Sequence, residues 1–558
     1  MALFRDVTRG GQIGFHFLSM FKQINQKLRY VALFLALIIA VYLFYEMPRE
    51  YLYDTFNYSN AYFWENLPKF HQNIRYKIRY ITPSGKIVIV DARKVLESYV
   101  VKDNIKFFKE YSITVLYASI AGMLSLYIIA IFFFKRLGGS QRQSKIVRGA
   151  ELVKINELIR MIRNNNAASD IKIGPLPIIK NTETNHIFLS GTTGSGKSNC
   201  IKSIIKQVRS RAQKMIIVDT TGEYVDFCYN KERGDKILNP FDTKSETWNM
   251  WNDFDSKFDI DAFAEVLFPI NKIDNFWSTA PQLLFKSAFN KMKRSQNRSY
   301  KRLYNALAVQ ETKALQDFVK DTPAEPFFEK HNHKTLLSIR SAMIPYIQFL
   351  EYLPEAGDKS FSIKQWIENE NETGILFLLC SPKQRQTMSQ LFTIWMDLAV
   401  RNIMELGTSK NRRIWFIIDE LASLKKLPSL PVLLSEVRKF GGCGIIGIQS
   451  IHQISDIYGN DIAQTILNLF STRLFFNCPE PRTQDWIIKS LGEQEEEKSI
   501  ENFSYGAHEI RDGVSLTKQM RTRPLILGSE LTNLEPNEAF VQLSRYPVSK
   551  VKIPIVKC

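Results

Sequence analysis

One eight-residue segment of this chain has the residue types and the spacing of a phosphate-binding loop. Its residues fit the pattern GxxxxGK[ST] and are Gly191, Thr192, Thr193, Gly194, Ser195, Gly196, Lys197 and Ser198. A short apolar run, residues 186–190, precedes the loop, and the helical pattern of residues 199–211 follows it. Glycines let backbone N–H groups surround phosphates, and the positive end of the following helix adds to the attraction. The segment therefore predicts a site for a nucleoside triphosphate such as ATP.

The two residues that end this loop have separate expected roles. We expect the Lys197 ammonium group to neutralise the β- and γ-phosphates of ATP, and the Ser198 hydroxyl to bind Mg²⁺. An ordinary glycine turn is the alternative. A chance match to this pattern in a chain of this length arises on the order of one time in a hundred, so phosphate binding is favoured.

An acidic pair lies far downstream at the end of another apolar run. Residues 413–418 (RIWFII) predict a buried strand, and Asp419 and Glu420 follow it directly. This is a Walker B pattern, in which Asp419 is expected to hold Mg²⁺ and Glu420 to polarise the attacking water. The pattern is common by itself, but a phosphate-binding loop upstream favours a functional pair.

Two further residues flank the next predicted strand, residues 442–450 (GCGIIGIQS). Gln449 at its end is placed to sense the γ-phosphate or to position a water. Arg438 precedes the strand in a basic, exposed turn, which suits an arginine finger that reaches the nucleotide of a neighbouring subunit. A surface salt bridge explains Arg438 equally well, and the residue pattern alone does not decide between the two.

Two more carboxylates, Asp219 and Glu223, end the apolar run of residues 215–224 (MIIVDTTGEY). Carboxylates at the end of a strand often cap the helix that follows. We therefore favour capping over a direct catalytic role for either residue.

The whole chain has the composition of a folded protein with more than one unit. It has 558 residues, of which 45% are hydrophobic and 23% charged, and this excludes extended disorder. Its net charge of +18 favours an anionic partner, either nucleic acid or a phospholipid surface. Its six cysteines form no CxxC pair, so we expect reduced thiols and neither a zinc site nor a disulfide framework.

Two uncharged runs predict membrane-spanning helices. Residues 30–45 carry no charge and extend to 28–47 if Arg29 and Glu46 reach the interfaces, and residues 111–134 are long enough to span without help. A cleavable signal peptide and a buried core helix are weaker interpretations of these runs. Between the runs, the sequence predicts two strands about a turn, followed by a helix start.

The orientation in the membrane follows from the location of the ATP site. Eleven Lys or Arg between the two runs leave the positive-inside rule without a clear answer. Because the nucleotide site must face the cytoplasm, two spans place both termini there. The expected location is the bacterial inner membrane, with about 60 residues on its far side.

In these motifs the chain resembles the F-type TraD coupling proteins of bacterial conjugation and type IV secretion. These proteins are relatives of TrwB and of the FtsK/HerA translocases. The likeness extends along nearly the whole chain in ordered blocks. These are residues 8–13 (TRGGQI), 171–178 (IKIGPLPI), 236–242 (KILNPFD), 275–277 (NFW), 297–300 (NRSY), 438–443 (RKFGGC), 447–450 (GIQS), 456–459 (DIYG) and 504–515 (SYGAHEIRDGVS).

This resemblance implies an α/β fold. It consists of a RecA-like nucleotide-binding domain that contains an inserted all-α domain and is preceded by an N-terminal two-helix transmembrane anchor. The resemblance also implies a ring of six subunits that receives DNA bound to a relaxase, the relaxosome, and passes it to the secretion channel. Arg438 and Gln449 match the family's RKxG and GxQS positions, which favours the finger role for Arg438. Several members have a long C-terminal extension that docks a relaxosome protein, and this chain stops at Cys558, so we do not expect docking through such a tail.

The expected division of the chain follows from these patterns. It comprises a cytoplasmic tail (1–27), a first span (28–47), a small periplasmic domain (48–110), a second span (111–135), the first part of the nucleotide-binding domain (136–255), the inserted all-α domain (256–358) and the second part of the nucleotide-binding domain (359–558). The insertion has helical spacing and no strand-like apolar run.

The expected function is therefore a membrane-anchored ATPase that pumps DNA. One alternative is a coupling ATPase that recruits protein effectors. Another is a docking scaffold that binds nucleotide without turnover, and the complete Walker B pair argues against it.

Overall fold

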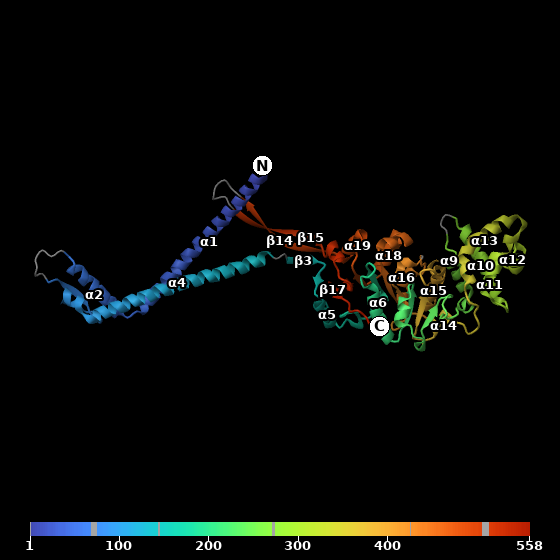
Figure 1. The fold of residues 1–558 in the computed structure, drawn as a ribbon, viewed down its shortest axis with the longest axis horizontal. Coiled ribbons are helices and arrows are strands. Elements are labelled where there is room, and N and C mark those ends of the chain that lie inside the picture. Colours follow the sequence, from blue (N-terminus) through green and yellow to red (C-terminus); the bar gives the residue numbers. More distant parts are fainter. Residues whose placement is uncertain are drawn as a thin grey trace. The chain divides into compact units, whose positions relative to one another are not determined.

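The computed structural model describes residues 2–67, 75–142, 145–270, 274–424, 426–504 and 513–557. Most of the block 504–515 used for the resemblance, residues 505–512, lies outside this set. The chain divides into two units (Figure 1). One comprises Met1–Lys145 and Lys498–Gln519, and the other comprises Ile146–Glu497 and Met520–Cys558.

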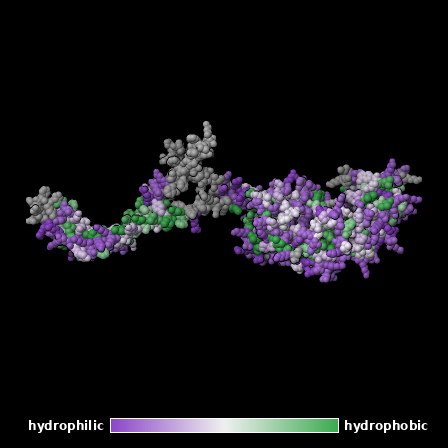
Figure 2. All heavy atoms as spheres, viewed as in Figure 1, coloured by the Kyte–Doolittle hydropathy of each residue, from purple (hydrophilic) through white to green (hydrophobic). Residues whose placement is uncertain are grey.

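Two long helices dominate the first unit. They are α1 (Ala2–Glu46) and α4 (Tyr99–Arg142), and their stretches Asn25–Glu46 and Tyr99–Phe133 are long and apolar enough to cross a membrane. Figure 2 shows hydrophobic surface along these helices, and large apolar side chains such as Phe34 are exposed on them. Such surface suits contact with lipid. The second helix starts at Tyr99, earlier than the span predicted at 111–135.

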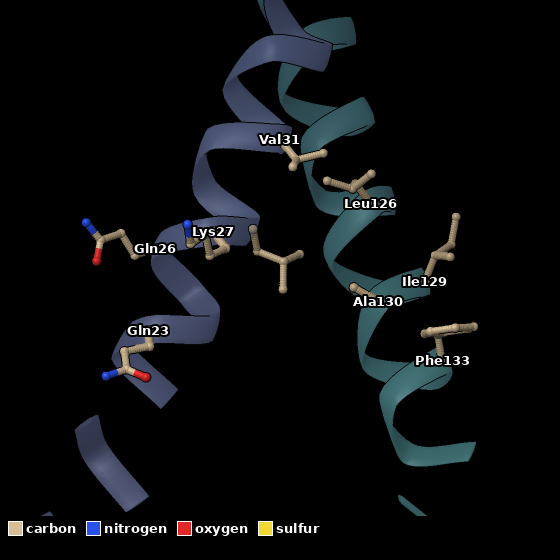
Figure 3. A pocket seen from close by; sticks show the side chains of 9 residues that line it. Gln23, Gln26, Lys27, Val31, Leu126, Ile129, Ala130 and Phe133 are labelled. Atoms are coloured by element: carbon tan, nitrogen blue, oxygen red, sulfur yellow. The ribbon is translucent and has the colours of Figure 1, made fainter. Parts of the chain in front are cut away.

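An open apolar cavity of about 720 Å³ lies between the two long helices (Figure 3). Val31 of α1 and Leu126 of α4 line it, together with Ile129 and Phe133 further along α4. Gln23 and Lys27 line the same cavity from α1, where the apolar stretch of that helix begins. The change from apolar to polar lining fits a membrane interface at this level.

A small domain joins the two long helices. It contains α2 (Arg49–Glu65), strands β1 (Lys77–Ile81) and β2 (Ile87–Asp91) paired antiparallel, and α3 (Ala92–Glu97). The two predicted strands and the helix start are confirmed, whereas α2 was not predicted. Asp54 of α2 accepts hydrogen bonds from the Tyr80 hydroxyl (2.7 Å) and from the Asn104 side chain (2.6 Å). The first turns of α4 therefore belong to this domain as well.

The second unit is built on a ten-stranded sheet. Its order is β4-β17-β16-β13-β7-β12-β11-β8-β10-β9, and the run from β13 to β9 is parallel. The strands are β4 (Leu152–Val153), β7 (Ile187–Ser190), β8 (Lys214–Asp219), β9 (Lys236–Leu238), β10 (Ile375–Leu379), β11 (Ile414–Ile418), β12 (Gly442–Ile448), β13 (Thr472–Phe475), β16 (Glu538–Leu543) and β17 (Val548–Lys552). The central strands are buried on both faces, which is why their sequences are continuous apolar runs.

Helices cover both faces of this sheet. They are α5 (Ile155–Asn164), α6 (Lys197–Ser210), α7 (Glu223–Cys228), α8 (Met250–Asp253), α14 (Ile363–Glu368), α15 (Arg385–Glu405), α16 (Leu430–Ser435), α17 (Ile451–Tyr458), α18 (Asn460–Asn468), α19 (Pro481–Leu491) and α20 (Gly528–Thr532). A separate hairpin, β5 (Ala168–Ile173) and β6 (Leu176–Ile179), precedes β7.

A helical insertion interrupts the sheet between α8 and α14. Its helices include α9 (Lys257–Leu267), α10 (Phe276–Arg294), α11 (Tyr300–Tyr304), α12 (Thr312–Phe318), α13 (His333–Ile347) and the short η6 (Gln348–Glu351). The described residues of this segment contain no strand. Phe263 and Phe289 of the insertion belong to the same hydrophobic core as Phe188 and Ile216 of the sheet. The insertion is thus packed continuously against the sheet.

One segment departs from the expected division. Strands β14 (Glu493–Ser504) and β15 (Gly513–Pro524) pair with β3 (Lys145–Gly149) in a three-stranded sheet. This sheet shares no strand with the ten-stranded sheet, so Lys498–Gln519 separates from the second unit. The prediction that 359–558 forms one continuous part of the nucleotide-binding domain is corrected at this place.

Candidate active site

The predicted phosphate-binding loop connects β7 to α6. Gly194 and Gly196 have φ angles of 78° and 112°, which favour glycine because a Cβ atom is strained there. At Gly196 a Cβ would also lie 2.7 Å from the Cα of Asn537, so a side chain has no room. The Ser195 hydroxyl donates to the Thr192 carbonyl (2.7 Å) and holds the loop curved. The sequence therefore folds into a tight loop at the amino end of a helix.

Lys197 lies at the centre of this loop with its ammonium group buried. Its Nζ donates to the carbonyls of Gly191 (2.5 Å) and Thr192 (3.1 Å). Burial lowers the pKa of Lys197, while the nearby carboxylates of Asp419 and Glu420 raise it. Carbonyl groups alone accept from the ammonium group within the described part of the chain, so its charge is available to an anion in the loop.

Asp419 faces the loop from the end of β11. Its Oδ2 accepts hydrogen bonds from the Ser198 hydroxyl (2.7 Å) and from the Tyr224 hydroxyl (2.7 Å). Its Oδ1 is buried and has no hydrogen-bond partner among the described residues. A buried carboxylate oxygen without a donor is costly unless a cation binds it. The Ser198 hydroxyl and the Asp419 carboxylate supply the oxygen ligands that Mg²⁺ prefers, so the residues present fit this ion.

Glu420 and Gln449 adjoin this pair. Gln449 and Glu420 line the same cavity, and Oε1 of Glu420 is buried without a partner in the described structure. Burial raises the pKa of Glu420, while Gln449 and Lys197 oppose that rise. A carboxylate with a raised pKa is suited to accept a proton from water.

Tyr224 is a site residue that the sequence did not reveal. It is the second residue of α7, its side chain is buried, and burial together with Asp419 raises its pKa well above the usual value. The hydroxyl therefore stays protonated and donates to Asp419. The one available signal was its place at the end of the run predicted at residues 215–224, because residue type alone does not single out a tyrosine.

Asp219 and Glu223 have structural partners. Asp219 accepts from the backbone N–H groups of Gly222 (2.7 Å), Tyr224 (2.8 Å) and Val225 (3.0 Å), so it caps α7. The Glu223 carboxylate pairs with Lys202 of α6 at 2.7 Å. The capping interpretation of Asp219 thus agrees with its contacts.

Arg438 lies apart from the other site residues. It belongs to the short helix η8 (Val437–Phe440), is exposed and lines a second cavity of about 450 Å³ together with Arg473 and Arg545. No acceptor contacts its guanidinium group among residues that the structure describes. The fold therefore brings Gln449, but not Arg438, to the phosphate-binding loop of the same chain.

The loop and the acidic pair share one cavity of about 620 Å³. Its lining includes Thr192, Thr193, Gly194, Gly196, Lys197, Ser198, Asp219, Thr220, Tyr224, Arg385, Asp419, Glu420, Gln449, Asn537 and Ile555. A phosphate-binding loop beside a Walker B pair, at the carboxyl edge of a mostly parallel sheet, defines a P-loop nucleotide-binding ATPase.

Comparisons with known proteins identify the family to which this chain belongs. The family described as "Type IV secretion-system coupling protein DNA-binding domain" matches residues 170–554. The coupling protein TraD of Escherichia coli K12 is 30% identical over 564 residues, covering 98% of this chain and 77% of that protein. The chain therefore belongs to the TraD/TrwB family of coupling proteins of conjugation and type IV secretion.

Solved structures of TrwB support the fold and the expected cofactors. An unbound conjugative coupling protein TrwB matches with a TM-score of 0.65 and 26% identity, over 74% of this chain and 94% of that one. TrwB in complex with ADP and Mg²⁺ matches with a TM-score of 0.65 and 27% identity, over 74% and 95%. These matches confirm the expected RecA-like fold, and the bound ADP and Mg²⁺ of TrwB agree with the expectation of ATP and Mg²⁺. The apolar helices α1 and α4 and the likeness to TraD indicate a membrane anchor.

Proposed function

We propose that this chain binds ATP with Mg²⁺, hydrolyses it, and uses the energy to move DNA toward a secretion channel. The observation that carries the proposal is the 2.7 Å hydrogen bond from Ser198 to Asp419, beside two buried carboxylate oxygens that lack donors. The loop and the acidic pair are thereby held together, with two carboxylate oxygens available to a cation.

The catalytic steps follow from the chain's own residues. Lys197 leaves the loop carbonyls and pairs with the β- and γ-phosphates. Glu420, which lines the same cavity as Gln449, accepts a proton from the attacking water, and its raised pKa makes it a stronger base. When bound by Ser198 and Asp419, Mg²⁺ supplies positive charge to the phosphate oxygens.

Arg438 is proposed to act between subunits. An exposed guanidinium outside its own nucleotide cavity fits a role at the nucleotide of a neighbour, where it stabilises charge as the terminal phosphate leaves. This role requires a ring, and we propose a homohexamer. Each cavity is then completed by the next subunit.

The cargo is proposed to be DNA bound to a relaxase in the relaxosome. The net charge of +18 suits a nucleic acid, and the matched family is described as a DNA-binding domain. Contacts to phosphates carry no base information, so binding is expected to tolerate any sequence, in single or double strands. We place the nucleotide site and both termini in the cytoplasm, with α1 and α4 spanning the inner membrane among its lipids.

ATP hydrolysis by the detergent-solubilised full chain, with and without single- and double-stranded DNA, tests this proposal. We expect DNA to raise the rate. If a candidate effector protein raises it and DNA does not, the cargo is polypeptide and the DNA part of the proposal is wrong. If neither changes it and no phosphate is released, the chain is a docking scaffold.

A further inference from the structure

Arg385, the first residue of α15, lines the cavity that holds the phosphate-binding loop. Its Nε is buried, and no acceptor or carboxylate contacts its guanidinium group in the described part of the chain. A guanidinium keeps its charge at any relevant pH, so burying part of it without an acceptor costs free energy. The cavity therefore contains an unpaired cation in addition to Lys197.

Strand register places Arg385 at the same edge of the sheet as the acidic pair. Leu379 of β10 pairs in register with Asp219 of β8, and Val218 of β8 pairs in register with Ile418 of β11. The Cys380 N–H also donates to the Asp219 carbonyl at 3.0 Å, so β10 and β8 end together. Residues 381–384 then lead directly into α15.

The strand order also tells which end of the nucleotide Arg385 faces. From β7, which carries the loop, the sheet continues through β12 with Gln449, β11 with the acidic pair, and β8 to β10. Asn537 and Ile555 line the cavity on the other side of the loop, toward β16 and β17. Phosphates in the loop point their terminal group toward the acidic pair, so Arg385 lies beyond that group and away from the nucleoside.

We propose that Arg385 binds the terminal phosphate of the nucleotide held by the same chain. The phosphate is either the attached γ-phosphate or the phosphate ion that hydrolysis leaves, and the inference rests on the proposed ATP hydrolysis. A guanidinium presents two parallel N–H donors that match two phosphate oxygens. Arg385 thus supplies from within the subunit a second positive group, distinct from Arg438.

The contact between Arg385 and the phosphate also affects helix α15, which begins at this residue. Helix α15 is buried along most of its length and packs against α9 and η6 of the helical insertion and against η8, which carries Arg438. When the phosphate leaves and the first turn of α15 shifts, α9, η6 and η8 shift with it, because packed helices move as units.

Equilibrium affinities of the full chain in detergent for ADP and for the non-hydrolysable analogue ADPNP test the proposal. For Arg385→Ala we expect ADPNP affinity to fall about tenfold or more, because a charge-assisted contact is lost, and ADP affinity to stay unchanged. Arg385→Lys, which keeps the charge without the two-pronged geometry, should lose less. Lys383→Ala removes a nearby exposed cation outside the cavity lining and should change neither affinity.

A second set of measurements distinguishes attached from released phosphate. If Arg385 holds the released ion, ADPNP affinity stays unchanged in Arg385→Ala, while inorganic phosphate in the presence of ADP binds about tenfold or more weakly. Equal losses for ADP and ADPNP, or no change in any of the three affinities, would overturn the inference. A wild-type chain that binds no nucleotide would instead overturn the proposed function on which it rests.

Discussion

The Tyr224 hydroxyl donates a 2.7 Å hydrogen bond to Oδ2 of Asp419, the same oxygen that accepts from Ser198. These two residues lie 195 positions apart in sequence and meet because β8 and β11 are neighbours in the sheet. The hydroxyl fixes the carboxylate so that Oδ1 stays free of donors. Tyr224 is therefore a positioning residue for the cation site.

Tyr224→Phe is expected to weaken Mg²⁺ binding while α7 stays folded. Removing a partner that orients a metal ligand typically costs about tenfold or more in metal affinity. The measurement is a Mg²⁺ titration of nucleotide binding and of ATP hydrolysis. Tyr458→Phe is the matched control, because Tyr458 is also buried but its oxygen accepts from Leu427 outside the site. An unchanged Mg²⁺ requirement in Tyr224→Phe would remove the positioning role.

Mixed rings test the role of Arg438 between subunits. Lys197→Ala should lose nucleotide binding, and Arg438→Ala should bind nucleotide and hydrolyse it about a hundredfold or more slowly. When the two variants are mixed, a neighbour with intact Arg438 faces some intact loops, so part of the activity should return. Lys439→Ala, which removes an adjacent exposed cation, should behave like the wild type. Absence of rescue in verified mixed rings would count against the finger.

His186, which directly precedes β7, makes the stability of the second unit depend on pH. Its Nδ1 accepts from the Gly444 N–H (2.9 Å) and its Nε2 donates to the Leu434 carbonyl (2.8 Å), so the buried ring is neutral. Burial lowers the pKa of His186 from 6.5 to about 4. As pH falls below about 6.5 the unfolded chain gains a proton that the folded chain resists, so stability is lost between pH 6.5 and 4.

The expected loss is on the order of 3 kcal/mol at the acidic end of this window. Denaturant unfolding followed by tryptophan fluorescence at several pH values measures it. His186→Gln should be less stable at neutral pH but show a shallower pH dependence than the wild type, whereas His452→Gln, at an exposed histidine, should keep the wild-type slope. Parallel slopes for His186→Gln and wild type would contradict the assignment.

DNA affinity should depend steeply on salt. If six or more phosphates are neutralised, affinity falls by roughly 10³-fold or more between about 50 and 200 mM salt. Unrelated sequences of equal length should bind alike. Affinity that is independent of salt would show that the chain does not track phosphates.

The sequence predicted those parts of the site that depend on local order. The loop at 191–198 follows a strand and begins a helix, so its neighbours along the chain determine its form. Asp419, Glu420 and Gln449 end apolar runs, and strands of a parallel sheet end at one edge. These residues could be assigned roles without knowledge of the strand order.

Other features depend on contacts between distant segments. The contact of Asn537 with Gly196 and the bond from Tyr224 to Asp419 follow from the strand order, which no local pattern encodes. Helix α2 was missed because its aromatic-rich sequence has weak helical periodicity, and packing against α4 stabilises it.

Phosphate release from ATP by the wild type and by Glu420→Gln, at saturating ATP and Mg²⁺, is the most direct test of the nucleotide site. We expect the wild type to release phosphate continuously. Glu420→Gln should bind ATP with similar affinity and release phosphate about a hundredfold or more slowly, because it lacks the proton acceptor. Equal rates for the two proteins, or no release by the wild type, would contradict the assignment of the loop and the acidic pair as an ATP-hydrolysing site.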